Sequence, residues 1–179
     1  VKVVNLNDED ILLVIDMQKD FARPKQKTVQ PFEVGNFYVK GGEKIIDPIA
    51  RQITKWVGPV YATVDYHPAD HCSFLPQSEK NCSGPFPPHC IQGTVGAHLV
   101  DPILEALNGR DSTKETEVFH KGFHKDKDSF GGVHYECSAF GEDIGRASDN
   151  IKGGNCDNDV LKKKTGAFNF NLENSKGRF

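Results

Sequence analysis

Residues 11–16 read Ile-Leu-Leu-Val-Ile-Asp, an apolar run that ends at an acidic side chain. Two later runs have the same form: residues 60–64 before Asp65, and residues 116–119 before His120 and Lys121. Continuous apolar residues are typical of strands buried on both faces, as in a parallel sheet that helices cover. The three runs therefore predict three buried parallel strands, of which the third is the weakest because Glu117 interrupts it.

Segments between these runs predict the connecting helices. In residues 44–57 the apolar side chains recur close to the helical period, and Asp47 followed by Pro48 indicates an N-cap and a first helical residue. A second segment has the same features: Asp101-Pro102, the apolar residues of 103–107, and Gly109 as a C-terminal stop. Alternating strands and helices predict an α/β fold, a doubly wound parallel sheet with flanking helices.

Three polar residues follow the predicted strands: Asp16, Asp65 and Lys121. In doubly wound sheets, ligands bind beyond the carboxyl ends of the strands, which is where these residues fall. Two interpretations of Asp16 stay open, because such a residue either caps the next helix or acts as a buried general base. Lys121 is either a solvated loop lysine or a partly buried cation, which would lower a thiol pKa or stabilise an oxyanion.

The segment that begins at Asp65 contains candidate metal ligands. Asp65 and His67 are two residues apart at a strand end, so their side chains point to the same side. His71 follows after a turn, and His89 follows two prolines that stiffen its backbone. An Asp-x-His pair alone is more often a surface turn. Three histidines and an aspartate at the ligand edge of the sheet favour a divalent metal.

The bulk composition limits the class of protein. A chain of 179 residues with 37% hydrophobic residues fits one domain with an ordinary core. The net charge of −3 gives no reason to expect binding to nucleic acid or to an anionic membrane. No apolar run approaches the roughly 20 residues that span a bilayer. The apolar run at 11–15 is too short for the hydrophobic part of a signal peptide.

The cysteines and the polar end of the chain suggest a compartment and a domain organisation. Five cysteines without a Cys-x-x-Cys pair argue against a disulfide framework and for a reducing, intracellular compartment, the cytoplasm or the nucleus. Residues 1–140 are predicted to form the N-terminal part of a single domain. Residues 141–179 are rich in Gly, Asn, Asp and Lys, and we predict a polar insertion or a disordered segment there.

Four stretches of the chain share their residues, order and spacing with a known family. They are Leu-Val-Ile-Asp-Met-Gln-Lys-Asp-Phe at 13–21, Thr-Val-Asp-Tyr-His-Pro-Ala-Asp-His-Cys-Ser-Phe at 63–74, Phe-Pro-Pro-His-Cys-Ile-Gln-Gly-Thr at 86–94, and Lys-Gly-Phe at 121–123 continuing to Asp-Ser-Phe at 128–130. In these stretches the sequence resembles the nicotinamidases of the isochorismatase-like cysteine hydrolase superfamily. The resemblance covers roughly residues 11–140 and implies an isochorismatase-like α/β fold.

The resemblance also implies a metal centre. Asp65, His67 and His89 would bind the ion, and His71 is a ligand or a near neighbour in some relatives. The ion would be Zn²⁺, with Fe²⁺ or Mn²⁺ as alternatives. In the family the metal holds the pyridine nitrogen and so fixes the carboxamide over the nucleophile, and such orientation is a large part of the rate acceleration.

Catalytic and substrate-binding roles follow from the same resemblance. Asp16 would deprotonate a cysteine thiol, and Lys121 would stabilise the resulting charge. The thiolate would attack the amide carbon, expel ammonia and form a thioester, which water hydrolyses to nicotinic acid. Phe21 would stack on the substrate. Phe86 stands where members of the family usually carry Trp, so the aromatic wall would be smaller.

The nucleophile is the point at which the sequence departs from the family. The expected cysteine lies in a strand-to-helix turn after a further strand, and Cys137 comes too soon after Lys121 to allow that strand. Cys156 is the remaining candidate, although no apolar strand precedes it. Cys72 and Cys90 belong to the metal segments and are expected to be structural. We therefore expect an incomplete chain that lacks the C-terminal strands of the fold.

These observations lead to one main function hypothesis and several alternatives. The main hypothesis is a nicotinamidase that converts nicotinamide to nicotinate and ammonia in NAD salvage. A close rival is an amidase of the same superfamily that acts on pyrazinamide-like amides. From other classes, the alternatives are a catalytically inactive metal- and nicotinamide-binding protein, and a zinc hydrolase that activates water and resists iodoacetamide. The expected partner is a small molecule, and a homo-oligomer stays open.

Overall fold

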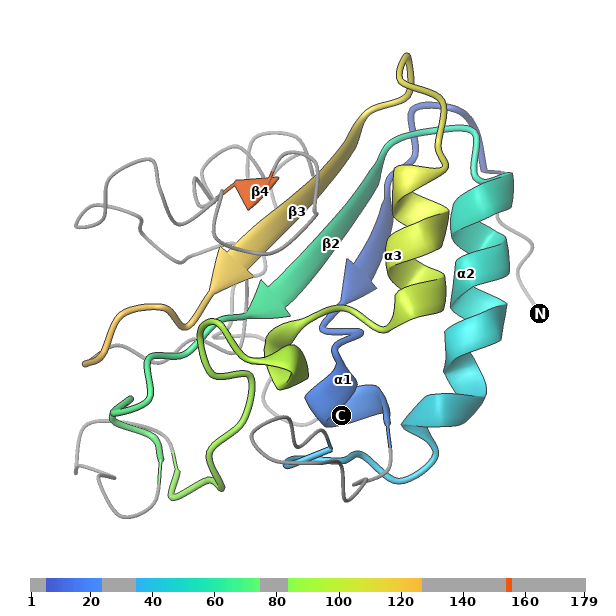
Figure 1. Cartoon of the computed structure of the whole chain (residues 1–179). Helices are drawn as coiled ribbons and strands as arrows, with labels where there is room; N and C mark the ends of the chain where they lie inside the picture. The colour runs from blue at the N-terminus through green and yellow to red at the C-terminus, as the bar shows by residue number, and fades with distance from the viewer. Residues whose placement is uncertain (1–5, 24–34, 75–83, 127–153, 156–179) are drawn as a thin grey trace, which may run out of the picture.

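A parallel β-sheet forms the centre of the computed structural model, which describes residues 6–23, 35–74, 84–126 and 154–155. Its strands are β1 (Leu12–Ile15), β2 (Val60–Asp65), β3 (Thr116–Lys121) and β4 (Gly154–Asn155), in the order β1-β2-β3-β4 (Figure 1). All three pairings are parallel. The three apolar runs of the sequence are therefore confirmed as strands, and the third continues beyond its apolar part to Lys121.

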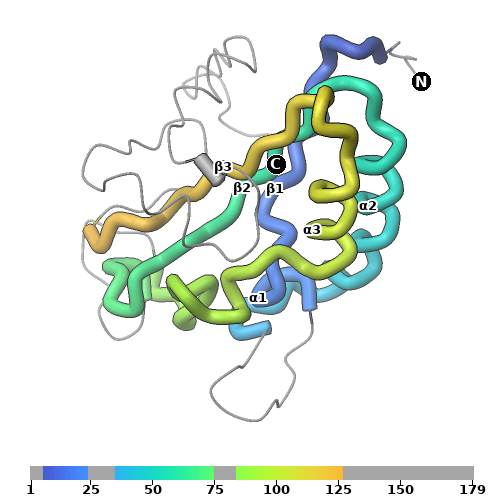
Figure 2. The backbone as a smooth tube through the Cα atoms, turned by 45° about the horizontal axis from the view of Figure 1, so that its top comes forward, coloured from blue at the N-terminus to red at the C-terminus, as the bar shows by residue number. Residues whose placement is uncertain are grey.

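Two helices cover one face of this sheet. They are α2 (Ile46–Lys55) and α3 (Asp101–Asn108), which lie side by side in Figure 1 and on the same side of the strands in Figure 2. Shorter turns complete the described elements: α1 (Lys19–Ala22) and the 3₁₀ turns η1 (Gly42–Ile45) and η2 (Val95–Ala97). The predicted α/β architecture, a parallel sheet with flanking helices, is confirmed.

The main hydrophobic core lies between the helices and the sheet. Ile53 of α2 and Ile103 of α3 are fully buried in it, together with alternate residues of β2 such as Ala62. The intervening β2 residue Tyr61 is buried on the opposite face, where it packs edge-on against Phe119. Burial of β2 on both faces explains its continuous run of apolar residues, since side chains alternate between faces along a strand.

Both helices begin differently from the sequence prediction. Asp47 is not an N-cap, because η1 runs directly into α2 and Asp47 already lies in the first turn. An N-cap needs extended backbone, and the residue before α2, Ile45, is helical with φ −95° and ψ −7°. In α3 the N-cap is Val100, and Asp101 is the first helical residue. Gly109 ends α3 as predicted.

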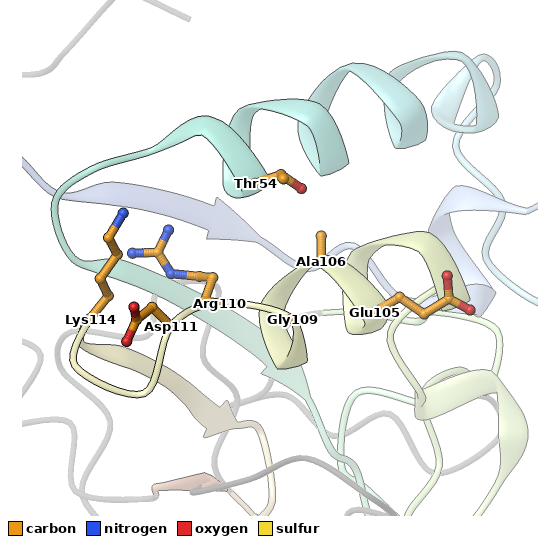
Figure 3. A pocket seen from close by; sticks show the side chains of 7 residues that line it. All are labelled: Thr54, Glu105, Ala106, Gly109, Arg110, Asp111 and Lys114. Atoms are coloured by element: carbon orange, nitrogen blue, oxygen red, sulfur yellow. The ribbon is translucent and has the colours of Figure 1, made fainter.

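Arg110 connects the end of α2 with the starts of β2 and β3, at the edge of the sheet opposite to the carboxyl ends of the strands. Its guanidinium donates hydrogen bonds to the carbonyls of Ile53, Trp56 and Gly58, and to Thr116 Oγ1. The first two carbonyls belong to the last turn of α2 and to the residue after it, and Ile53 O also accepts a hydrogen bond from the Trp56 amide. Figure 3 shows Arg110 beside a pocket of about 170 Å³ near the C-terminal ends of α2 and α3.

Cys72 is disulfide-bonded, so the expectation of fully reduced cysteines is wrong at this position. Composition and cysteine count could not reveal this bond, because bonding depends on the distance between two cysteines in the fold.

Among the described residues, no helix is long and apolar enough to cross a membrane. Apart from β4, the segment 141–179 lies outside the described residues, and its interpretation stays a prediction.

Candidate active site and metal centre

Asp16, Asp65 and Lys121 meet at the carboxyl edge of the sheet. The parallel register pairs Asp65 with Lys121 at the ends of β2 and β3, and Asp16 directly follows β1. Lys121 Nζ lies 3.0 Å from Asp16 Oδ2 and donates a hydrogen bond to Asp65 Oδ1. The lysine side chain is only 3% exposed. Lys121 is therefore a buried cation between two carboxylates, and the interpretation as a solvated loop lysine is wrong.

Asp16 marks the point at which the chain leaves β1. Its φ of 50° lies in the left-handed region, which costs a non-glycine residue on the order of 1–3 kcal/mol. It does not cap the next helix, because the N-cap of α1 is Gln18. Its Oδ1 instead accepts a hydrogen bond of 2.8 Å from Thr63 Oγ1. With 21% of its side chain exposed, Asp16 is the member of the trio that a bound molecule can reach.

The three charges shift one another's pKa values. Burial raises the pKa of Asp16, and the positive charge of Lys121 opposes this only in part. Burial also raises the pKa of Asp65, but His67 and Lys121 outweigh it and bring the value down to about 2. Burial alone would lower the pKa of Lys121. The charges and hydrogen bonds of Asp65 and Asp16 raise it by more than that, so the pKa of Lys121 lies above its ordinary value. Lys121 thus stays protonated and Asp65 stays ionised, while Asp16 is the easiest of the two carboxylates to protonate.

A buried cluster with the chemistry of a metal site adjoins this trio. One donor atom from each of Asp65, His67 and His89 lies within 4.8 Å of the other two. The Nε2 atoms of the two histidines are 3.6 and 4.0 Å from Asp65 Oδ2. Asp65 therefore faces the lysine with one oxygen and the histidines with the other.

The histidine rings are held in the orientation that a metal ligand needs. His67 Nδ1 lies 2.8 Å from the carbonyl of Gly122, and His89 Nδ1 lies 2.7 Å from the carbonyl of Pro87. A carbonyl only accepts, so each Nδ1 is the ring atom that donates to it, and each Nε2 is the ring atom that faces the cluster. Burial lowers the pKa of His89, which favours its neutral ring. The donor set fits a divalent metal such as zinc.

Gly122 makes room for this arrangement. It directly follows β3 with φ 67°, and a Cβ at this position would overlap with the His67 ring. Glycine alone combines the left-handed backbone with the close approach of the imidazole. At the end of β3, Lys121 thus supplies a positive charge, and Gly122 leaves room for the His67 ring.

His71 is buried next to the cluster but is not part of it. Its ring centroid is 4.4 Å from that of His67, and its Nδ1 lies 2.7 Å from Ser73 Oγ. Among the described residues, the donor atoms that gather belong to Asp65, His67 and His89. A role of His71 as a metal ligand stays a prediction.

Aromatic rings form one wall beside the cluster. Phe21 and Phe86 lie 5.3 and 6.5 Å from the ring of His89, measured between centroids. Phe37 lies between them, 6.0 Å from Phe21, 5.5 Å from Phe86 and 4.7 Å from His89. Phe37 was not predicted from the sequence, because its surroundings contain no motif that would single it out. Phe21 and Asp16 also line a mostly apolar pocket of about 280 Å³, whose remaining lining residues come from β1, α1, η1 and the residues next to them, and none of the three residues of the cluster lines it.

The two cysteines of the described residues are poor nucleophiles. Cys72 is disulfide-bonded and so has no thiol. Cys90 is fully buried, and burial raises its pKa well above the ordinary value. Both fit the expected structural roles, since the reactive form of cysteine is the thiolate. Cys156 lies outside the described residues, and its role stays a prediction.

Comparisons with known proteins place this chain in a family. Over 145 residues the chain is 28% identical to the nicotinamidase of Saccharomyces cerevisiae, covering 69% of this chain and 61% of that protein. The PnC1 protein of L. infantum, solved in complex with nicotinate, is 32% identical with a TM-score of 0.55, over 70% of this chain and 54% of that one. The chain belongs to the nicotinamidase/pyrazinamidase family of isochorismatase-like hydrolases.

A third relative was solved with a bound metal of its own. The pyrazinamidase of Pyrococcus horikoshii, solved in complex with zinc, is 28% identical with a TM-score of 0.53, over 77% of this chain and 62% of that one. No family model matches the chain. The chain spans only 50% to 61% of the lengths of four curated nicotinamidases and nicotinamidase/pyrazinamidases.

Proposed function

We propose that this chain carries the metal-binding and proton-transfer part of an amide hydrolase that converts nicotinamide to nicotinate and ammonia in NAD salvage. The observation that carries the proposal is the continuous array that runs from the partly exposed Asp16 through the buried Lys121 and Asp65 to the histidine pair. In this array two carboxylates, a lysine and two histidines lie side by side at the edge of the sheet where ligands bind in such folds, which supports the roles proposed below.

The metal ligands in this proposal are Asp65, His67 and His89, with Zn²⁺ as the ion and Fe²⁺ or Mn²⁺ as alternatives. Three protein ligands leave a position open for a further donor. A bound zinc would supply a Lewis acid that holds the pyridine nitrogen of the substrate. Support comes from the buried, preoriented Nε2 atoms and from the zinc in the Pyrococcus horikoshii relative.

Asp16 is proposed as the base. It accepts the proton of a cysteine thiol, and the thiolate attacks the amide carbon while the C–N bond breaks. Asp16 returns the proton to the leaving nitrogen, so ammonia departs and a thioester remains. Water then hydrolyses the thioester to the acid and restores the thiol. Its raised pKa and partial exposure suit Asp16 to this shuttle.

Lys121 is proposed to keep Asp16 ionised, so that Asp16 can accept a proton. Its positive charge, 3.0 Å from Asp16 Oδ2, offsets the burial that would otherwise hold Asp16 protonated. The same cation compensates the negative charge that passes between thiolate and carboxylate during the reaction. Phe21 and Phe86, with Phe37 between them, are proposed to form the wall against which a flat aromatic ring packs.

The test is ammonia release from nicotinamide by the purified chain with zinc supplied. The proposal expects release that Asp16→Asn reduces by about 10²-fold or more, a typical cost of losing a general base. Cys156→Ala identifies the nucleophile if it abolishes release and a Cys90→Ala control does not. Release that is unaffected by Asp16→Asn and by iodoacetamide would refute the cysteine mechanism.

An alternative function has an observation in its favour. Neither cysteine in the described residues offers a thiolate, because Cys72 is disulfide-bonded and Cys90 is buried with a raised pKa. A catalytically inactive protein that binds a metal and nicotinamide is consistent with this. Calorimetric binding of nicotinamide to the zinc-loaded chain, without ammonia release, would favour this alternative over the hydrolase.

A further inference from the structure

Gln18 binds the backbone of a proposed metal ligand. Its side chain is fully buried, and its Oε1 accepts a hydrogen bond of 2.8 Å from the Asp65 amide. Its Nε2 donates to the Asp65 carbonyl at 2.6 Å and to the Ala97 carbonyl at 2.7 Å. The side-chain amide thus makes both backbone hydrogen bonds of Asp65 that face it.

These hydrogen bonds take the place of the backbone hydrogen bonds that a longer β1 would make with Asp65. The ladder between β1 and β2 ends at Ile15 and Thr63, and Asp16 then turns away with φ 50°. Without a substitute, the Asp65 amide and carbonyl would have no partner on this side, and a buried backbone group without a partner costs about 1–3 kcal/mol. Gln18 allows Asp16 to leave the sheet while Asp65 stays in register with Lys121.

Asp20 performs a similar function for the other metal segment. Its carboxylate is buried, with Oδ2 accepting a hydrogen bond of 2.7 Å from the Cys90 amide. Cys90 directly follows His89 and has a left-handed φ of 45°, which needs such an external partner to persist. Oδ1 accepts from the Asn36 amide at 3.1 Å. A Cβ at Gly96 would overlap with this carboxylate.

We propose that Gln18 and Asp20, two buried polar residues of the α1 segment, position the metal ligands Asp65 and His89. Gln18 acts through the backbone of Asp65, and Asp20 acts through the amide after His89. One short segment thereby sets the distance between ligands that are 24 positions apart in the sequence. The inference rests on the proposed metal site, because it assigns the two residues to the geometry of its ligands.

The experiment measures zinc affinity by competition with a chelator, together with the thermal midpoint of unfolding. Gln18→Leu has nearly the same size but no amide, and we expect it to weaken zinc binding about 10- to 100-fold, the usual cost of losing a partner that orients a ligand. Asp20→Asn, which keeps one oxygen, should weaken it less. Arg110→Met is the control, because it removes hydrogen bonds of similar number away from the metal cluster. It should lower the midpoint without changing zinc affinity.

A second measurement separates this inference from the proposed function. Amide hydrogen exchange of the metal-free chain should accelerate at Asp65 in Gln18→Leu and at Cys90 in Asp20→Asn, while the amides of α2 keep their rates. This result supports positioning even in a chain that releases no ammonia. Unchanged zinc affinity in Gln18→Leu, an equal loss of affinity in Arg110→Met, or unchanged exchange at both amides would overturn the inference.

Discussion

At the scale of single residues, the site depends on one lysine that lies between two carboxylates. Lys121 contacts both Asp16 and Asp65, yet the two carboxylates respond in opposite directions. Asp65 also faces His67, and its pKa falls to about 2, whereas burial dominates at Asp16 and raises its pKa. Two carboxylates with separated pKa values can take separate roles, one as a permanent anion and one as a proton acceptor.

A change at Thr63 should shift the titration of Asp16. The Thr63 hydroxyl donates to Asp16 Oδ1 and lowers its pKa, opposing the effect of burial. Thr63→Val removes this donor at nearly constant volume, so we expect the pKa of Asp16 to rise further. A carboxylate loses its charge as pH falls through its pKa, and the acid limb of any activity that uses Asp16 as base should move to higher pH.

The measurement is the ¹³C chemical shift of the Asp16 carboxyl against pH in the parent and in Thr63→Val. This readout does not depend on catalysis. A conservative Thr63→Ser change keeps the hydroxyl and should titrate like the parent. A lower midpoint in Thr63→Val would contradict the assignment of this hydrogen bond.

At the scale of elements, the local sequence pattern predicted the strands correctly but not the starts of the helices. Strand positions followed from apolar runs, because a strand buried on both faces has few alternatives to continuous apolar side chains. Helix starts did not follow from Asp-Pro pairs, because η1 extends α2 backward past Asp47. Asp101 likewise became a helical residue, and its carboxylate pairs with Lys19 at 2.7 Å. Caps depend on the preceding backbone, which a residue pair does not specify.

Arg110 offers a test at this scale. It bonds the end of α2 to the start of β2 and to β3 through Thr116, so Arg110→Met should lower the free energy of unfolding by about 2 kcal/mol. Arg110→Lys retains the charge but not the planar set of donors, and should recover only part of the loss. Urea unfolding followed by far-UV circular dichroism measures both. Equal stability of the Met variant and the parent would show that these hydrogen bonds contribute nothing.

At the scale of the whole molecule, the metal cluster connects separate parts of the chain. Asp65 ends β2, His67 follows it, and His89 comes from the loop before η2. The rings of Phe21 and Phe37 close the same region from the segments around α1. A ligand that binds only when these segments are assembled stabilises the folded state by mass action.

Zinc should therefore raise the thermal midpoint of unfolding. At a free concentration 100 times the dissociation constant, the expected gain is about 2.7 kcal/mol. A chelator should reverse it, and His89→Ala should abolish it, because the variant lacks one of the three clustered donors. His124→Ala is the control, since this half-buried histidine lies outside the cluster. A zinc-dependent rise that persists in His89→Ala would place the ion elsewhere.

The sequence alone determined the parallel strands, the ligand edge of the sheet and the residue types gathered there. These follow from patterns that are local in the chain, such as an apolar run that ends at Asp16 or a histidine two positions after Asp65. Only the tertiary structure decided that Lys121 is buried between two carboxylates, and that Phe37 stands beside His89. Burial and contact between distant segments depend on how the chain packs, and no local pattern encodes that.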